Sequence, residues 1–403
     1  MGEYTRSLAN REYNISPEDE NYKEELLEVA QSFRTFDAAL DEFILQKGYN
    51  GELADVDAKI KFIKRKFEEA DISLDLRTPR NWFYNHKQGT NRDIAFQFCF
   101  AFQLTLDETQ AFFRQVYLQR GIDCHDVNEA IYYYCISHRM TYSEAQELIK
   151  MAPQKDKKGN IDLSGDVLFT GSIIRELDRF DTPDELLTFL NENSEQFGYN
   201  NATAYKNINE IWEDIVCDKG VIYCEERLLY PNKTVSNKHR SVWDIYLQIF
   251  GLLDYDEVDN SKLFVMKGDR TLQPLFKGNS LLHPVARESF PDRQGLEGII
   301  KGVYQSDEVV RKTIILLVFY RFWAKKCVKN NSSEYLSNPK EANRCLSAIN
   351  KQLVNAGYPA LYEGNPYDWI FMFAAQDEYP LSAFRYFMRE LYLNQEEEND
   401  ELQ

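Results

Sequence analysis

Glycine and proline are scarce in this chain, with 18 glycines and 12 prolines among 403 residues. A sandwich or barrel of many short strands needs turn formers at regular intervals, so this scarcity disfavours such folds and favours helices. Histidine is scarcer still, with five residues, and none of the patterns H-E-x-x-H, G-x-S-x-G, G-x-x-x-x-G-K-[ST] and G-x-G-x-x-G occurs. The common zinc-protease, hydrolase, P-loop and dinucleotide sites therefore lack a local signature. We predict a protein that is not an enzyme and holds no cofactor.

Long apolar runs are also missing. The longest, from Ile314 to Ala324, is interrupted by Arg321, whereas a membrane-spanning helix needs about 20 apolar residues. The first residues contain no apolar stretch of the kind found in a signal peptide. The seven cysteines are scattered and odd in number, which is typical of reduced thiols rather than of a disulfide framework. We therefore predict a cytoplasmic protein without membrane contact.

Basic residues are in deficit. Lysine and arginine number 47 against 65 aspartates and glutamates, which gives a net charge of −18. A surface of this sign cannot hold nucleic acid as a whole, so any contact with DNA requires a local basic patch. Aromatic residues make up 14% of the chain, too many for intrinsic disorder, and the length allows two or three domains.

Helix starts recur along the chain and predict a mainly α-helical fold. Thr105, Thr141 and Thr182 each precede a glutamate by three residues, which is the pattern of a capping box. The expected organisation is as follows: an N-terminal helical extension at 1–53, a helix-turn-helix-like domain with a trailing helical hairpin at 54–152, a linker at 153–170, a middle helical region at 171–280, a C-terminal helical domain at 281–394 and an acidic tail at 395–403.

Three segments carry strand-like patterns. Phenylalanines alternate with other residues from Phe96 to Phe102, but the same segment also fits a helix that is apolar nearly all round, and we predict a buried helix. Segments 220–224 and 262–272 are rich in strand formers. They predict a small β element or an extended loop within residues 217–280.

One internal similarity is visible. Residues 126–149 align without gaps on residues 365–388, so that Glu129 meets Asp368, and a glycine precedes each segment at an apparent helix end, Gly121 and Gly357. Both segments predict a buried helix, a short polar turn and a second helix. The C-terminal domain is thus a diverged repeat of residues 54–152, or else two helical hairpins share a common pattern.

Metal ligation has one candidate group, formed by Cys124, His125, Cys135 and His138. Cys135 and His138 stand three apart on one helix face, which is usable ligand spacing. The aligned second segment has Ala374 and Asp377 at those two positions. We predict that the group is structural and that no metal binds.

The positive charges gather in two neighbouring segments. Residues 56–67 have an apolar stripe at helical spacing, and the basic residues flank or oppose it, so we expect them to face outwards. Residues 77–92 have basic charges only and open like a short helix. Outward Arg, Asn and Gln side chains on such a helix can bond base edges and phosphates in the major groove, although an ordinary polar helix has the same pattern. The predicted DNA-binding residues are Lys59, Lys61, Lys64 and Arg65 at phosphates, and Arg80, Asn81, Asn85, Lys87, Gln88 and Arg92 at the groove.

These residues lie in a part of the chain, from about 56 to 150, that resembles the lambda-repressor-like (Xre-type) helix-turn-helix proteins common in Firmicutes. The matching order is a basic amphipathic helix, the polar short helix TPRNWFYNHKQG, a helix opened by Thr90-Asn91-Arg92-Asp93, and a turn at Leu104–Thr109 into a further helix. Segments Asp126–Cys135 and Met140–Ile149 resemble the helical hairpin that often follows this domain. The resemblance covers about a quarter of the chain.

The resemblance implies a bacterial DNA-binding transcriptional regulator. Its local basic face would contact double-stranded DNA, and its C-terminal domain would sense a ligand, form a homodimer or contact a protein partner. The alternative is a non-enzymatic interaction or scaffold protein that reuses the helix-turn-helix fold without DNA. Charge placement distinguishes the two hypotheses, because DNA binding requires positive charge to collect on one face of residues 56–92.

Overall fold

The computed structural model describes residues 33–85, 89–153, 170–194, 197, 202–229, 241–251, 293–303 and 305–393. Within these residues the chain is helical and forms no β-strand, which confirms the predicted mainly α-helical fold. The chain divides into two compact units. The N-terminal unit comprises Arg34–Ala202 with Ala356–Pro359, and the C-terminal unit contains Thr203–Asn355 and Ala360–Gln403. The predicted N-terminal extension up to residue 32, most of the linker and the acidic tail lie outside the described residues.

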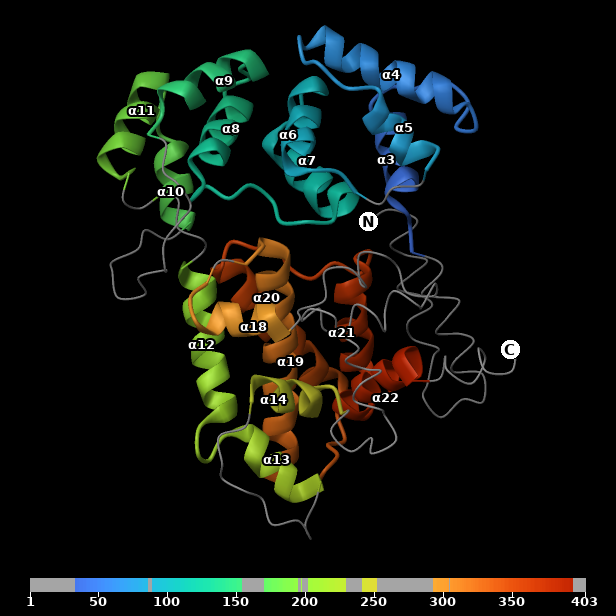
Figure 1. Cartoon of the computed structure of the whole chain (residues 1–403), viewed down its shortest axis with the longest axis vertical. Coiled ribbons are helices and arrows are strands. Elements are labelled where there is room, and N and C mark those ends of the chain that lie inside the picture. Colours follow the sequence, from blue (N-terminus) through green and yellow to red (C-terminus); the bar gives the residue numbers. More distant parts are fainter. Residues whose placement is uncertain are drawn as a thin grey trace. The chain divides into compact units, whose positions relative to one another are not determined.

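The N-terminal unit is a bundle of short helices around an aromatic core (Figure 1). Phe98 lies at its centre and stacks on Phe102 and Phe112, with ring centroids 5.5 and 5.7 Å apart. The elements in chain order are α3 (Phe36–Gln46), α4 (Val56–Glu69), α5 (Arg77–Phe83), α6 (Arg92–Ala101), α7 (Leu106–Phe112), the π-helical turn η1 (Phe113–Tyr117), α8 (Val127–Ser137), α9 (Tyr142–Met151), α10 (Thr170–Leu177) and α11 (Pro183–Glu192).

Local sequence signals explain where several of these helices begin. Thr105, Thr141 and Thr182 each accept a hydrogen bond from the backbone of the glutamate three residues on, whose side chain bonds back. All three predicted capping boxes are thus confirmed. The phenylalanine-rich segment is helix α6, buried on most of its surface, as predicted.

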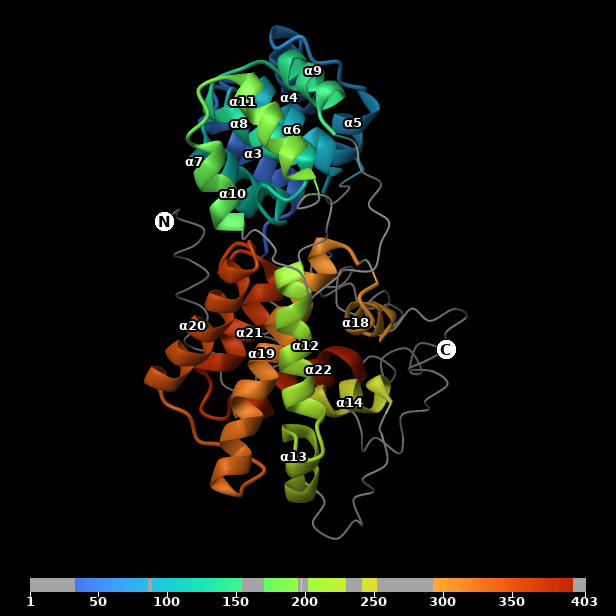
Figure 2. The ribbon, with the colours of Figure 1, turned by 90° about the vertical axis from the view of Figure 1, so that its left-hand side faces the viewer.

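The C-terminal unit is built around one long helix, α19, of 24 residues (Figure 2). Helices α13, α18, α20, α21 and α22 all pack against it. The unit contains α12 (Ala202–Val216), α13 (Val221–Leu229), α14 (Val242–Ile249), α18 (Arg293–Ile300), α19 (Asp307–Asn330), α20 (Pro339–Asn355), α21 (Pro366–Gln376) and α22 (Pro380–Leu393).

The predicted strand at 220–224 is wrong, because Val221–Leu229 forms helix α13. Its β-branched and aromatic residues pack in a helical core: Val221, Ile222 and Tyr223 are all buried. Tertiary burial outweighs the modest β-propensity of such residues. The other strand-like segment, 262–272, lies outside the described residues.

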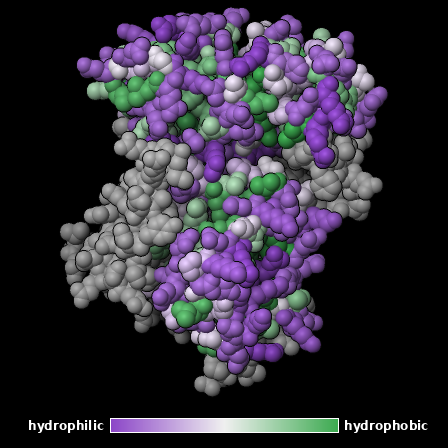
Figure 3. Space-filling model, turned by 180° about the vertical axis from the view of Figure 1, so that it is seen from behind, coloured by the Kyte–Doolittle hydropathy of each residue, from purple (hydrophilic) through white to green (hydrophobic). Residues whose placement is uncertain are grey.

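The surface is mainly polar. On the face seen in Figure 3, hydrophilic side chains dominate and the apolar residues form separate groups. In the described part of the chain, no helix combines the length and the apolar character needed to cross a membrane.

Candidate functional site

Two of the predicted DNA-binding residues are used inside the fold. Lys59 is only 4% exposed, its ammonium lies 2.8 Å from the carboxylate of Asp41, and it sits over the ring of Phe83. Arg92 donates to Glu129 and to the backbone carbonyls of Arg120 and Gly121. The expectation that these charges face outwards is wrong for Lys59, because α3 and α5 cover the side of α4 that carries it.

The other cations of α4 are exposed or partly exposed, and most of them are neutralised. Lys64 and Arg65 pair with Glu68 and Glu69, one helical turn further on, at 3.1 and 3.5 Å. Lys61 is exposed and makes no ion pair with the described residues. Exposed pairs of this kind contribute little stability, but they reduce the positive potential that a phosphate would meet.

Helix α5 presents Arg80 to solvent. Asn85 donates a hydrogen bond to Asn81 on the same face, at 2.8 Å. Lys87 and Gln88 lie outside the described residues. The structure therefore brings Lys61, Arg80, Asn81 and Asn85 to the surface in the segment predicted to bind DNA.

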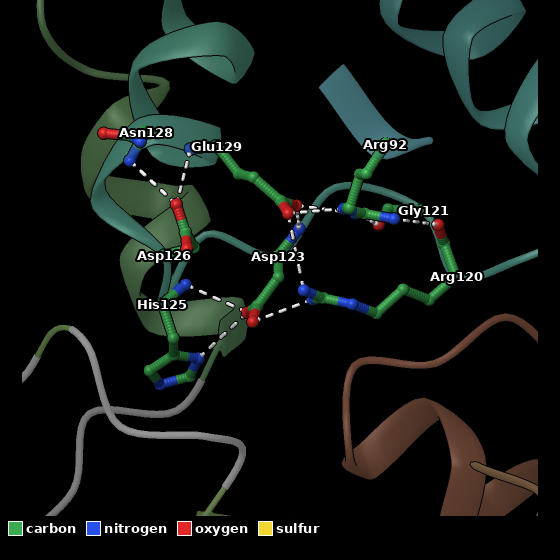
Figure 4. A network of polar contacts seen from close by, with 8 residues as sticks. All are labelled: Arg92, Arg120, Gly121, Asp123, His125, Asp126, Asn128 and Glu129. Atoms are coloured by element: carbon green, nitrogen blue, oxygen red, sulfur yellow. Dashed lines mark hydrogen bonds and ion pairs between the residues drawn. The ribbon is translucent and has the colours of Figure 1, made fainter. Parts of the chain in front are cut away.

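Glu129 is the centre of a buried polar network that joins α6 to α8 (Figure 4). Arg92 donates two hydrogen bonds to its carboxylate, and the backbone N–H of Asp123 donates a third at 2.7 Å. Arg120 pairs with Asp123, and the backbone N–H of His125 donates to the same aspartate. Since Arg92 is the first residue of α6 and Glu129 lies in the first turn of α8, these hydrogen bonds join the starts of the two helices.

The C-terminal unit contains the same arrangement. Arg311 of α19 donates two hydrogen bonds to Asp368, at 2.7 and 2.6 Å, and the backbone N–H of Tyr362 donates to the same carboxylate. Asp368 and Glu129 are each the third residue of their helix, and each N–H donor stands six residues earlier. The sequence alignment that pairs Glu129 with Asp368 thus has a structural counterpart.

Further contacts follow the same register. The N-cap residues Asp126 and Asn365 each accept from the second and third N–H of their helix. An aromatic ring of α6 contacts one of α8, Phe100 with Tyr132, and in the same way a ring of α19 contacts one of α21, Phe319 with Phe371. These shared contacts support a duplication, and we call α6–α9 copy 1 and α19–α22 copy 2.

The glycine used in the sequence comparison is not the equivalent one. Gly357 has φ +73°, and the residue aligned with it at the same spacing is Leu118, with φ +56°. Gly121 does not have a positive φ. A leucine in the left-handed region gives no sequence signal, so the comparison of Gly121 with Gly357 is wrong and Leu118 is the residue that corresponds to Gly357.

The cysteines are thiols, and no group of three or more candidate metal ligands exists among the described residues. Five of the seven cysteines are buried, and burial raises the pKa of Cys99 and of Cys135 to about 12. At neutral pH these groups are protonated and are not thiolate ligands or nucleophiles.

A cavity of about 440 Å³ lies in the N-terminal unit, where α4, α6 and α8 end and α9 begins. Ligand pockets typically measure about 300–1,000 Å³. Its lining combines apolar residues with polar ones near the rim: Glu69, Ala70, Asp71, Cys99, Phe100, Gln103, Leu104, Ile136, Arg139, Met140, Thr141, Tyr142 and Ser143. The sequence analysis did not identify this site.

Three helices end at the cavity in the same way. The residue after each C-cap, namely Asp71, Gln103 or Arg139, has a positive φ of 49–58°. The next residue donates its N–H five residues back, to the carbonyl of Phe67, Cys99 or Cys135, at 2.8–2.9 Å. This is the Schellman motif, which glycine usually completes, and a side chain in that conformation costs about 1–2 kcal/mol.

The ends of these helices determine the electrostatics of the cavity. Each helix C-terminus has the equivalent of about half a negative charge on its last carbonyls. The chain itself provides one donor, because the Arg139 guanidinium donates to the carbonyl of Gln103 at 3.2 Å. The cavity therefore offers hydrogen-bond acceptors above an apolar floor, which suits a ligand with N–H donors and an apolar group.

Comparison with known proteins finds no matching family model, no matching curated protein and no matching solved structure.

Proposed function

We propose that this chain is a non-catalytic binding protein whose N-terminal unit receives a short segment of a partner protein in the cavity at the ends of α4, α6 and α8. The observation that carries the proposal is the convergence of three Schellman motifs, all without glycine, on one cavity. Backbone conformations of this cost tend to persist where a site requires them. A peptide supplies both features that the cavity suits, backbone N–H donors and apolar side chains.

This proposal corresponds to the interaction-protein alternative rather than to DNA binding. Lys59 and Arg92 form ion pairs with Asp41 and Glu129. Lys64 and Arg65 form ion pairs with Glu68 and Glu69. These pairs lower the positive charge that α4 and α5 present to a phosphate, which favours the interaction-protein alternative. A homodimer or a second partner at the C-terminal unit stays a prediction.

Blocking the cavity tests the proposal. Ser143 lines the cavity and is exposed, so Ser143→Trp should fill it without disturbing the core. Full-length wild type and variant are panned against a displayed peptide library. We expect peptides that are enriched on wild type and at least about tenfold less on Ser143→Trp, a loss of about 1.4 kcal/mol in binding.

Glu147→Trp is the matched control, because Glu147 is exposed on the same helix and does not line the cavity. It should retain the enriched peptides, and both variants should melt within a few degrees of wild type. Equal enrichment on wild type and Ser143→Trp would overturn the proposal, as would the absence of any enriched peptide.

DNA binding by α4 and α5 is the second candidate function, favoured by the exposure of Lys61 and Arg80. It predicts that mixed-sequence duplex DNA binds more weakly as salt rises. Lys61→Ala and Arg80→Ala should each reduce the slope of log K against log salt by about 0.9. Lys150→Ala, an exposed lysine on α9, is the control. A slope that neither substitution changes would remove this candidate.

A further inference from the structure

In copy 2, the turn between α21 and α22 is covered by another part of the chain. Residues 332–338, which follow the end of α19, lie against it: the backbone N–H of Ser337 donates to the carbonyl of Glu378 at 2.7 Å. The Ser382 hydroxyl donates to the carboxylate of Glu334 at 3.3 Å. The covering segment itself forms no helix.

Alternate residues of this segment face the protein. Tyr335 and Ser337 are partly buried, whereas Glu334 and Leu336 are exposed, with Leu336 at 61%. The ring of Tyr335 packs against Trp323, which is fully buried, with centroids 6.2 Å apart. The segment is therefore held by the ring and hydroxyl of Tyr335, by the N–H of Ser337 and by the carboxylate of Glu334, whereas the side chain of Leu336 points to solvent.

In copy 1, the turn at the same sequence register lines the cavity, and its backbone differs from that of copy 2, because Arg139 has φ +58° whereas Glu378 has no positive φ. The register that pairs Glu129 with Asp368 also pairs Arg139 with Glu378 and Ser143 with Ser382. Arg139 and Ser143 are both exposed cavity residues. The carbonyl of Arg139 and the hydroxyl of Ser143 make no hydrogen bond with the described part of the chain, so the two groups that hold the segment in copy 2 are available in copy 1.

The lengths of the first helices explain the difference. Helix α19 continues to Asn330 and its chain then passes over the turn, whereas α6 ends at Ala101 and leads within five residues into α7. Among the described residues, no segment consequently covers the turn of copy 1 as residues 332–338 cover that of copy 2, and the end of α4 lines the cavity instead.

Building on the proposed function, we propose that the cavity binds a non-helical peptide segment of a partner protein as residues 332–338 bind in copy 2. An aromatic side chain of the partner enters the apolar floor beside Phe100 and Leu104. Two residues further on, a backbone N–H of the partner donates to the carbonyl of Arg139. A polar residue directly before the aromatic one accepts from the Ser143 hydroxyl. The ligand class is thus a peptide with a polar–aromatic pair, read through its backbone, because Glu69, Asp71 and the helix C-termini at the cavity disfavour a further negative charge.

The chain provides its own probe. A synthetic peptide with the sequence of residues 331–338, Asn-Ser-Ser-Glu-Tyr-Leu-Ser-Asn, is titrated into the full-length protein and followed by calorimetry. We expect saturable binding to wild type and to Glu147→Trp, and at least a tenfold loss with Ser143→Trp. Within the peptide, Tyr335→Ala should weaken binding by a similar factor, because aromatic anchors dominate small interfaces. Leu336→Ala should leave it unchanged.

Methylation of single peptide nitrogens tests whether the peptide donates a backbone N–H to Arg139, independently of whether it occupies the cavity. A methyl group on the nitrogen of Ser337 removes the donor for Arg139 and should abolish binding, whereas a methyl group on that of Leu336 should not. Equal binding of the two methylated peptides would overturn the backbone contact. If library peptides bind wild type but not Ser143→Trp, and the 331–338 peptide does not bind wild type, this inference is wrong and the proposed function stands. If neither binds, both are wrong.

Discussion

Replacing Asp368 by alanine should lower the free energy of unfolding of the C-terminal unit by about 3–5 kcal/mol, measured by urea denaturation. The carboxylate is fully buried and Arg311 is 4% exposed, so the guanidinium would be left as an uncompensated charge away from water. The backbone N–H of Tyr362 would lose its acceptor as well.

Two further variants distinguish the cost of the unpaired Arg311 charge from the cost of the lost packing. Arg311→Met combined with Asp368→Leu should recover the part of the lost stability that comes from the stranded guanidinium, because an apolar pair carries no desolvation penalty, whereas the N–H of Tyr362 still lacks its acceptor. Glu378→Ala, at an exposed carboxylate ten residues further along the chain, should change stability by less than about 0.5 kcal/mol. A loss below 1 kcal/mol for Asp368→Ala would show that the buried pair does not hold α19 to α21.

The sequence predicted the features that depend on neighbours in the chain. Capping boxes at Thr105, Thr141 and Thr182 could be identified because both partners stand three residues apart. The helical character of Phe96–Phe102 followed from the apolar positions and from the absence of a turn signal. The alignment of Glu129 with Asp368 was also visible, since the two segments share their pattern of apolar positions.

The burial of Lys59 could not be predicted, because it depends on Asp41 and Phe83, which belong to other helices. A lysine next to an apolar stripe normally keeps its ammonium in water. Here a carboxylate and an aromatic face replace the water. Arg92 is a similar case, because its partner Glu129 lies 37 residues away.

The cavity had no sequence signal for a different reason. Helix ends with a left-handed residue are normally identified by glycine or asparagine, but the three positions at the cavity are Asp71, Gln103 and Arg139. The alignment of the two copies does not indicate which other residues of the chain pack on the turn of each copy. The segments around the two turns share their apolar pattern, and this pattern does not indicate that residues 332–338 cover the turn of copy 2 while no described segment covers that of copy 1 in the same way.

The second large effect is expected at Glu225, which is fully buried and ties together α13, α14, α19 and α22. Its carboxylate accepts from the Tyr320 hydroxyl at 2.6 Å and from the Gln248 amide at 3.1 Å, and Arg385 pairs with it at 2.9 Å. Burial, with Glu225 close by, raises the pKa of Tyr320 well above its ordinary value. The hydroxyl therefore keeps its proton and remains a donor throughout the ordinary pH range.

Glu225→Ala should lower the free energy of unfolding by about 3–5 kcal/mol, because Arg385 would keep only the carbonyls of Gln248 and Ile249 as partners and its charge would stay buried. Tyr320→Phe removes one bond to a charged acceptor and should cost about 1.5–3 kcal/mol. Asp218→Ala, at an exposed position, should be within about 0.5 kcal/mol of wild type. Urea denaturation of the three variants should give this order, and an equal loss for Glu225→Ala and Tyr320→Phe would show that the hydroxyl, and not the buried arginine charge, determines the stability of the network.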